Sequence, residues 1–166
     1  MDVLLRDHFR FIWRLLRRVG VPDAVVEDAT QEVFIVAMRR LSDIEPGKER
    51  AFLYGVALRV ASDARRLTAR RQEAPATVLE LVPAGEAGPE ELLQQKEARA
   101  LLDEILAHMS VEIRVVFILF ELEEMTSVDI AACVGVPLGT VASRLSRARK
   151  EFHAHAKRLQ LQRGIP

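Results

Sequence analysis

The stretch TSVDIAACVGVPLGTVASRLSRARK, residues 126–150, predicts two short helices joined by a tight turn. Thr126 followed three residues later by Asp129 is a helix-start pattern, because a hydroxyl and a carboxylate can both bond the free backbone N–H groups there. Gly135 can take the left-handed conformation that ends a helix. Pro137 has no N–H to leave unpaired where the next helix begins. Together these features predict a helix-turn-helix.

The second of these helices separates apolar from polar residues. At 100° per residue one side is apolar and can pack on the first helix, through Val141, Leu145, Ala148 and Phe152. The opposite side is small, polar or cationic, with Gly139, Ser143, Ser146, Arg147 and Lys150, and with Arg144 and Arg149 on its flanks. Small residues permit close approach to a groove, and cations suit phosphates. An ordinary surface helix with solvated arginines is the alternative; the pattern favours DNA binding.

The charge of the chain is concentrated in segments. The 166 residues have a net charge of zero, and 49% of them are hydrophobic, which argues against disorder throughout. Residues 1–73 carry +3 and residues 126–166 carry +5, whereas residues 74–100 and 101–125 carry −3 and −5. Two basic ends therefore flank an acidic middle, and two separate DNA-facing surfaces would explain this arrangement.

Several classes of protein are disfavoured. Cys133 is the only cysteine, so no internal disulfide can form and a cytoplasmic location is expected. The longest purely apolar run, residues 115–120, is far too short for a membrane span, and no membrane insertion is expected. The four histidines share no ligand spacing with Cys133, and there is no Gly-rich phosphate loop. We expect no metal, no cofactor and no enzymatic activity.

The N-terminal half predicts three helices, at about residues 3–19, 23–41 and 49–71. The third has a predicted buried stripe of Leu53, Val56, Val60, Ala64 and Leu67. Its opposite face is cationic, with Arg59, Ser62 and Arg66 flanked by Arg65 and Arg70, and with Phe52 and Tyr54 at one end. Such a face suits a nucleic-acid backbone, with rings available to stack on unpaired bases. Core aromatics with solvated arginines are an equal alternative.

The second predicted helix has an acidic and amide cluster around an exposed hydrophobe. Asp28, Gln31 and Glu32 lie together on its outer face, with Ile35 among them. This pattern is typical of a docking surface for a basic helical partner. A solvated face with one isoleucine exposed by chance is the simpler interpretation, and the residues alone favour it.

A proline- and glycine-containing segment divides the chain. Residues 73–88 show no hydrophobic periodicity and are net acidic, which is typical of a linker. Helical patterns resume at about residue 89, and the segment 111–122 is apolar almost all round, as expected of a core helix. The sequence therefore predicts an all-α protein of two small helical domains, residues 1–73 and 91–166, joined by a linker at residues 74–90.

Three segments resemble one known family. Residues 27–34, EDATQEVF, resemble the D-x-x-Q-E-x-F segment of bacterial sigma factors. Residues 51–57, AFLYGVA, with Arg65 and Arg66 after them, are similar to the helix that follows in that family. Residues 139–149, GTVASRLSRAR, resemble its recognition helix. The two-domain size and the linker are similar to those of the extracytoplasmic-function subgroup, and the resemblance covers nearly the whole chain.

The resemblance implies a promoter-specificity subunit of bacterial RNA polymerase. It implies that the first domain docks on the polymerase clamp helices through Asp28, Gln31, Glu32 and Ile35. The adjoining loop, residues 42–48, and the basic helix would then hold the melted −10 strand, with Phe52, Arg59, Ser62, Arg65 and Arg66 as candidates.

The resemblance also implies roles for the second domain. It would sit on the polymerase flap and read the −35 element of promoter DNA through Thr140, Ser143, Arg144, Arg147 and Lys150. The linker would thread toward the RNA exit channel, and an anti-sigma factor is a possible further partner. The alternative function is a helix-turn-helix regulator that binds duplex DNA as a dimer without joining the polymerase.

The sequence departs from the family pattern at functional positions. Phe52 stands where tryptophan is usual, and Arg59 stands where asparagine is frequent. The segment 109–114 lacks the usual proline. Ala142 replaces a common lysine or arginine, which removes one expected phosphate contact and should weaken DNA binding without changing sequence preference.

Overall fold

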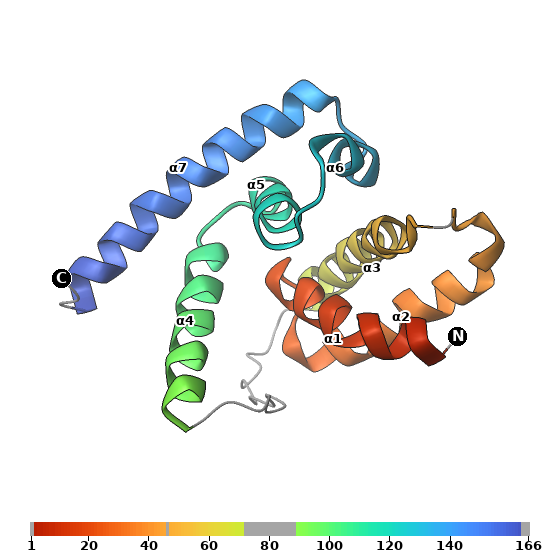
Figure 1. Ribbon diagram of the computed structural model, residues 1–166, viewed down its shortest axis with the longest axis horizontal. Helices are drawn as coiled ribbons and strands as arrows, with labels where there is room; N and C mark the ends of the chain where they lie inside the picture. Colours follow the sequence, from red (N-terminus) through yellow and green to blue (C-terminus); the bar gives the residue numbers. More distant parts are fainter. Residues whose placement is uncertain (1, 46, 72–88, 164–166) are drawn as a thin grey trace.

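The computed structural model describes residues 2–45, 47–71 and 89–163, and it contains no strand among them (Figure 1). The N-terminal half consists of α1 (Asp2–Arg18), α2 (Asp23–Arg39), the 3₁₀ turn η1 (Leu41–Asp43) and α3 (Glu49–Arg71). The C-terminal half consists of α4 (Pro89–Ala107), α5 (Val111–Phe117), the π-helical turn η2 (Ile118–Leu122), α6 (Ser127–Val134) and α7 (Leu138–Arg163). The prediction of an all-α fold is confirmed. Most of the predicted linker, residues 74–90, lies outside the described residues.

The first three helices pack around a shared apolar core. Ile12 and Leu16 of α1, Val33 of α2 and Leu53 of α3 are fully buried. Phe9 of α1 stacks on Phe34 of α2 with ring centroids 6.0 Å apart. Apolar residues from all three helices therefore form the core of this half.

In the C-terminal half, α5 is the central helix. Its residues Ile113, Val116 and Phe117 are buried, as the all-round apolar pattern predicted. The Phe117 ring stacks on Phe152 of α7 with centroids 4.9 Å apart. In Figure 1, α4, α6 and α7 surround α5, and α7 forms the long outer edge.

The helix-turn-helix has the predicted caps. The Thr126 hydroxyl accepts a hydrogen bond from the backbone N–H of Asp129 at 3.2 Å and donates one to the Asp129 carboxylate at 2.7 Å. The carboxylate therefore bonds the hydroxyl, not the backbone N–H that the sequence pattern suggested. Gly135 ends α6 in the left-handed conformation, with φ of 67°. The prediction of two helices joined at this glycine is confirmed.

Replacing Gly135 with alanine should lower the free energy of unfolding by about 1 kcal/mol, because only the left-handed backbone opposes the new side chain. A Cβ at this position would have no atom within 4 Å. The matched control is Gly139→Ala in α7, where a Cβ also has open space but φ is not positive. That variant should be stabilised by about 0.5–1 kcal/mol. Chemical denaturation of both variants measures the difference, and equal stability would contradict the role of Gly135.

The two halves contact each other. Residues of α3 lie close to α6, and residues of α1 lie close to α4. The buried side chains of both halves form one contiguous cluster. The division into domains at residues 73 and 91 stays a prediction, and the structure shows the two groups of helices packed together.

Within the described part of the chain, no single helix is long and apolar enough to cross a membrane. The pair α6 and α7 meets the length and composition test only when taken together, across a bend of 103°.

Candidate nucleic-acid and partner interfaces

The start of α7 brings the five predicted −35 residues together. Val141, Leu145 and Ala148 are buried beneath it. The other side of the same turns carries Thr140, Ser143, Arg144, Arg147 and Lys150. Ser143, Arg147 and Lys150 are exposed, and Thr140 and Arg144 are half-buried. One helix surface therefore presents a hydroxyl-rich first turn and cations in the turns that follow.

Intramolecular contacts leave most of this surface free to bind. Arg147 donates to Glu151 at 3.0 Å, but an exposed pair of this kind contributes only about 0–1 kcal/mol, so a phosphate or base can displace it. Arg149 is different: it donates to Glu121 at 2.6 Å and lies over the Phe120 ring at 5.2 Å. Arg149 therefore fastens α7 to η2, a role that its position in the recognition motif does not reveal.

The predicted −10 residues on α3 fall into two groups, those that are exposed and one that is bonded within the protein. Arg59 and Arg66 are exposed, and Ser62 is half-buried beside them. Arg65 instead donates to the backbone carbonyl of Val19 at 2.8 Å, and burial lowers the pKa of its guanidinium. Arg65 thus ties α3 to the end of α1 in this conformation.

The two aromatics at the start of α3 have different surroundings. Phe52 is half-buried, and the Arg40 guanidinium lies over its ring at 5.6 Å. Tyr54 is only 1% exposed, and its ring packs on Phe11 with centroids 4.7 Å apart. Of the two interpretations of these rings, the structure places Tyr54 in the core.

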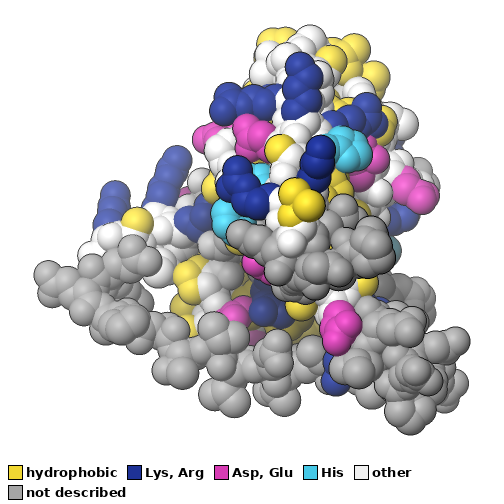
Figure 2. Space-filling view, turned by 90° about the vertical axis from the view of Figure 1, so that its left-hand side faces the viewer, with side chains coloured by type: hydrophobic (Ala, Val, Ile, Leu, Met, Phe, Trp, Pro, Cys, Tyr) yellow, Lys and Arg dark blue, Asp and Glu magenta, His cyan; other side chains and the backbone are white. Residues whose placement is uncertain are grey.

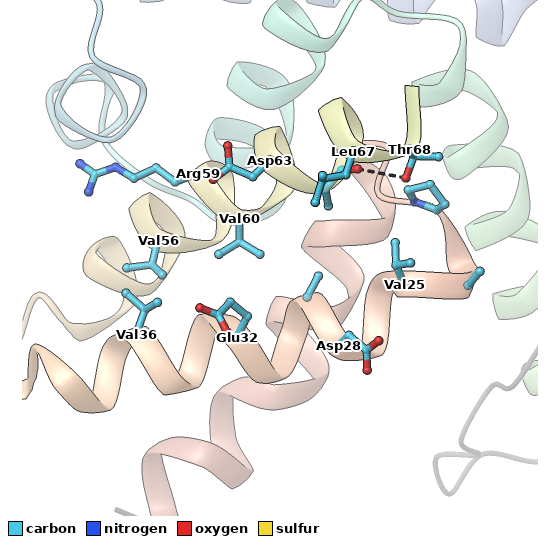
Figure 3. A pocket seen from close by; sticks show the side chains of 14 residues that line it. Val25, Asp28, Glu32, Val36, Val56, Arg59, Val60, Asp63, Leu67 and Thr68 are labelled. Carbon is cyan, nitrogen blue, oxygen red and sulfur yellow. Dashed lines mark hydrogen bonds between the residues drawn. The ribbon is translucent and has the colours of Figure 1, made fainter. Parts of the chain in front are cut away.

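A groove of about 740 Å³ lies between α2 and α3 (Figure 3). Its walls are largely apolar, with Val25 and Val36 from α2 and Val56, Val60 and Leu67 from α3. Three acidic residues also line the groove, namely Asp28, Glu32 and Asp63. Arg59 is the cation in the lining. Two of the predicted docking residues, Asp28 and Glu32, therefore border this groove. Gln31 is exposed and Ile35 half-buried elsewhere on α2.

The groove changes the interpretation of α3. The predicted buried stripe included Val60, Ala64 and Leu67, but Val60 and Ala64 are only half-buried and Leu67 is 54% exposed. The buried side is rotated toward Tyr54, Ala57 and Ala61. The prediction was therefore right for Leu53 and Val56, partly right for Val60 and Ala64, which pack half-buried against the core, and wrong for Leu67.

The far end of α7 packs beside α4. On this face, Figure 2 shows dark-blue Lys and Arg, magenta Asp and Glu and cyan His side chains intermixed. His155 of α7 packs against His108 of α4 with ring centroids 4.9 Å apart. Among the side chains that the structure describes, no three His, Cys, Asp or Glu residues are grouped as a metal site would require.

Comparison with known proteins gives one consistent family. The family model for sigma-70 region 2 matches residues 4–71, and the model for sigma-70 region 4 matches residues 99–152. The first match covers the predicted docking and −10 residues, and the second covers the helix-turn-helix.

Individual relatives agree with these matches. The ECF RNA polymerase sigma factor SigE of Mycolicibacterium smegmatis is 32% identical over 152 residues, which cover 91% of this chain and 59% of that protein. The ECF RNA polymerase sigma-E factor of Escherichia coli K12 is 30% identical over 141 residues, which cover 78% of this chain and 73% of that protein.

Solved structures show the same fold. The sigma factor RpoE of Bartonella quintana, in complex with the anti-sigma factor NepR, matches with a TM-score of 0.73 at 20% identity, over 92% of this chain and 94% of that one. CnrH, in complex with the cytosolic domain of CnrY, matches with a TM-score of 0.63 at 24% identity, over 92% of this chain and 84% of that one. Helix order, surface chemistry and relatives together show that the chain belongs to the sigma-70 family, in its extracytoplasmic-function group.

Proposed function

We propose that this sigma factor directs core RNA polymerase to promoters, with one surface for the polymerase and two for DNA. The proposal rests on one side of α7, on which Ser143, Arg147 and Lys150 are all exposed while the opposite side of the helix is buried. Such a helix fits the DNA major groove, with its first turns toward the base edges. The protein acts by binding, without a catalytic site, and works in the cytoplasm, where the polymerase is.

The groove between α2 and α3 supports a docking role for the first half. An amphipathic helix with basic flanks could place its apolar side against Val56 and Val60 while its cations meet Asp28 and Glu32. Helix-in-groove binding uses this combination of apolar anchors and complementary charge. We assign the polymerase clamp helices to Asp28, Gln31, Glu32 and Ile35, and an anti-sigma factor is a second partner that can compete for the same region.

The exposed face of α3 supports a role in holding a melted strand. Arg59 and Arg66 can contact backbone phosphates, and Ser62 and Phe52 lie on the same helix nearby. Arg65 is less suited to this role in the present conformation, because its guanidinium is bonded to the Val19 carbonyl. We assign Arg65 to fixing the angle of α3, which would orient the other residues.

Co-purification with core RNA polymerase tests the proposal and separates it from the alternative. A sigma factor should bind core polymerase with a 1:1 stoichiometry and acquire duplex promoter binding as part of that complex. A conventional helix-turn-helix regulator should bind duplex DNA alone, as a dimer, and should not bind the polymerase. The second result would overturn the proposal.

Restoring a cation at Ala142 should strengthen DNA binding without changing promoter choice. Ala142 is exposed on the second turn of α7. We expect Ala142→Lys to add one phosphate contact and to steepen the slope of log K against log salt by about 1. Ala154→Lys, farther along α7 and also exposed, is the control and should leave the slope unchanged. Fluorescence anisotropy of the holoenzyme on promoter DNA measures both, and equal slopes would contradict the assigned orientation of α7.

A further inference from the structure

The two halves are joined by a buried carboxylate. Glu123, which follows η2, is 10% exposed and reaches the first turns of α3. The Tyr54 hydroxyl donates to Glu123 Oε2 at 3.0 Å, and Arg50 Nη2 donates to the same oxygen at 3.4 Å. Arg50 also donates to the Tyr54 hydroxyl at 3.1 Å, which closes a three-residue network.

Additional contacts extend the junction on both sides. The Cys133 thiol of α6 donates to the backbone carbonyl of Ala51 at 3.3 Å. At the other end, Arg114 of α5 donates to the Arg18 carbonyl at 3.3 Å, and Arg18 pairs with Asp103 of α4 at 3.0 Å. The halves therefore meet along a line from the start of α3 to the end of α1, with Glu123 between the two ends.

This junction lies against the proposed −10 surface. The charge of Arg59 acts on the Cys133 thiol, and Asp129 of α6 attracts Lys48 in the loop before α3. Helix α6 and its acidic residue are therefore close to the loop and the helix assigned to the melted strand. Asp129 of α6 therefore competes with a negatively charged strand for Lys48, and α6 lies where such a strand would approach the start of α3.

We propose that Glu123, Tyr54 and Arg50 form a latch that keeps the free protein closed, with α6 covering the start of α3, and that promoter engagement requires this latch to open. The inference rests on the proposed function for its consequence in transcription, but the closed state can be measured without the polymerase.

The electrostatics of the latch permit release. Four groups face Glu123: Tyr54 and Arg50 from α3, and Arg18 and Arg14 from α1. Burial nevertheless raises the pKa of Glu123 above its usual range, because the free energy of hydration that the ionised carboxylate loses exceeds the favourable interaction with these four partners. Because the raised pKa belongs to the closed form, acid should strengthen the latch and a pH above this pKa should favour opening.

The native cysteine allows the closed state to be trapped with one substitution. Cys133 is the only cysteine, and it already touches residue 51. In the variant Ala51→Cys, oxidised glutathione can accept the two electrons and two protons of the thiol pair and leave a disulfide between α3 and α6. We expect rapid intramolecular crosslinking, seen as a mobility shift on a non-reducing gel. Absence of the crosslink would overturn the closed arrangement.

Charge reversal tests the latch itself. Adding Glu123→Lys to Ala51→Cys places a new cation among Arg14, Arg18 and Arg50, and should slow crosslinking about tenfold or more, which corresponds to about 1.4 kcal/mol. Adding Glu124→Lys, an exposed neighbour with the same change of charge, should slow it much less. Helix content by circular dichroism should match in both. Equal rates in the two variants would show that Glu123 does not hold the halves together.

Run-off transcription with core polymerase then tests the consequence. Oxidised Ala51→Cys should initiate at least about tenfold less than the same protein after reduction. Ala51→Ser, which cannot crosslink, should be insensitive to oxidant. Equal activity of the oxidised and reduced forms would overturn the latch as a barrier to promoter engagement. Lack of activity in wild type and Ala51→Ser alike would count against the proposed function, not against the closed state.

Discussion

Arg147→Ala is expected to reduce transcription from −35-dependent promoters about 10- to 100-fold while leaving polymerase binding intact. A bidentate contact from arginine to a base contributes about 1–3 kcal/mol of discrimination. Arg147 is exposed on the side of α7 that we propose faces DNA, and it pairs with Glu151 on the same helix. Loss of this side chain should therefore remove a DNA contact without disturbing the core. Arg144→Ala, one turn nearer the start of α7, should act in the same direction.

The control for this prediction is Arg158→Ala. Arg158 is an exposed arginine of the same helix, but it lies beyond the segment that matches sigma-70 region 4. The variant Arg158→Ala removes the same charge as Arg147→Ala, but at a greater distance from the first turns of α7. The measurement is run-off transcription together with the Kd for core polymerase. A fall in polymerase affinity for Arg147→Ala, or an equal effect of Arg158→Ala, would contradict the separate assignment of DNA reading to α7.

The double variant Asp28→Ala with Gln31→Ala is expected to weaken docking on core polymerase about 10- to 100-fold. Truncation of a central polar contact in an interface costs about 1–2 kcal/mol, and the two residues lie within one turn of α2. Both are exposed and no described contact within the chain depends on them, so the fold should tolerate the change. The Kd for core polymerase is the quantity to measure.

Glu97→Ala provides the comparison for docking. Glu97 is an exposed carboxylate of α4 in the other half of the protein. Its removal tests whether any loss of negative charge lowers affinity for a basic partner. Undiminished affinity in the Asp28 and Gln31 double variant would exclude this face as the docking surface. An equal loss of polymerase affinity in the double variant and in Glu97→Ala would show that the effect comes from long-range electrostatics and not from a local contact.

The helix-turn-helix could be predicted because its determinants are local. Thr126 caps the helix that begins at the next residue by bonding Asp129, three residues along, and Gly135 ends that helix through its own backbone. Val141 and Leu145 then fix the buried side of the next helix by spacing alone. Local bonding and periodicity are properties that a sequence displays directly.

The orientation of α3 could not be predicted in the same way. The apolar residues Val60 and Leu67 have the spacing of a core stripe, but they line a groove that a partner can fill. The buried positions Ala57 and Ala61 are small and give little hydrophobic signal, although small residues let helices approach closely. A groove wall and a core face have the same sequence pattern, so only the packing of α2 against α3 separates them.

Long-range partners explain the remaining differences. Tyr54 is bonded to Glu123, 69 residues away, and Arg65 is bonded to the carbonyl of Val19, 46 residues away. Neither partner has a spacing that marks it in the sequence. An aromatic or a cation on a helix therefore has two possible roles until its surroundings are known, and the family resemblance does not settle which of them applies in the free protein.

Run-off transcription with purified core polymerase on a library of promoter fragments measures whether this protein directs the polymerase to promoters. We expect initiation at a defined subset of fragments that share a −35 and a −10 element, with none from core polymerase alone. Initiation that does not depend on this protein would contradict it. So would binding of the isolated protein to duplex DNA with no change in where the polymerase starts.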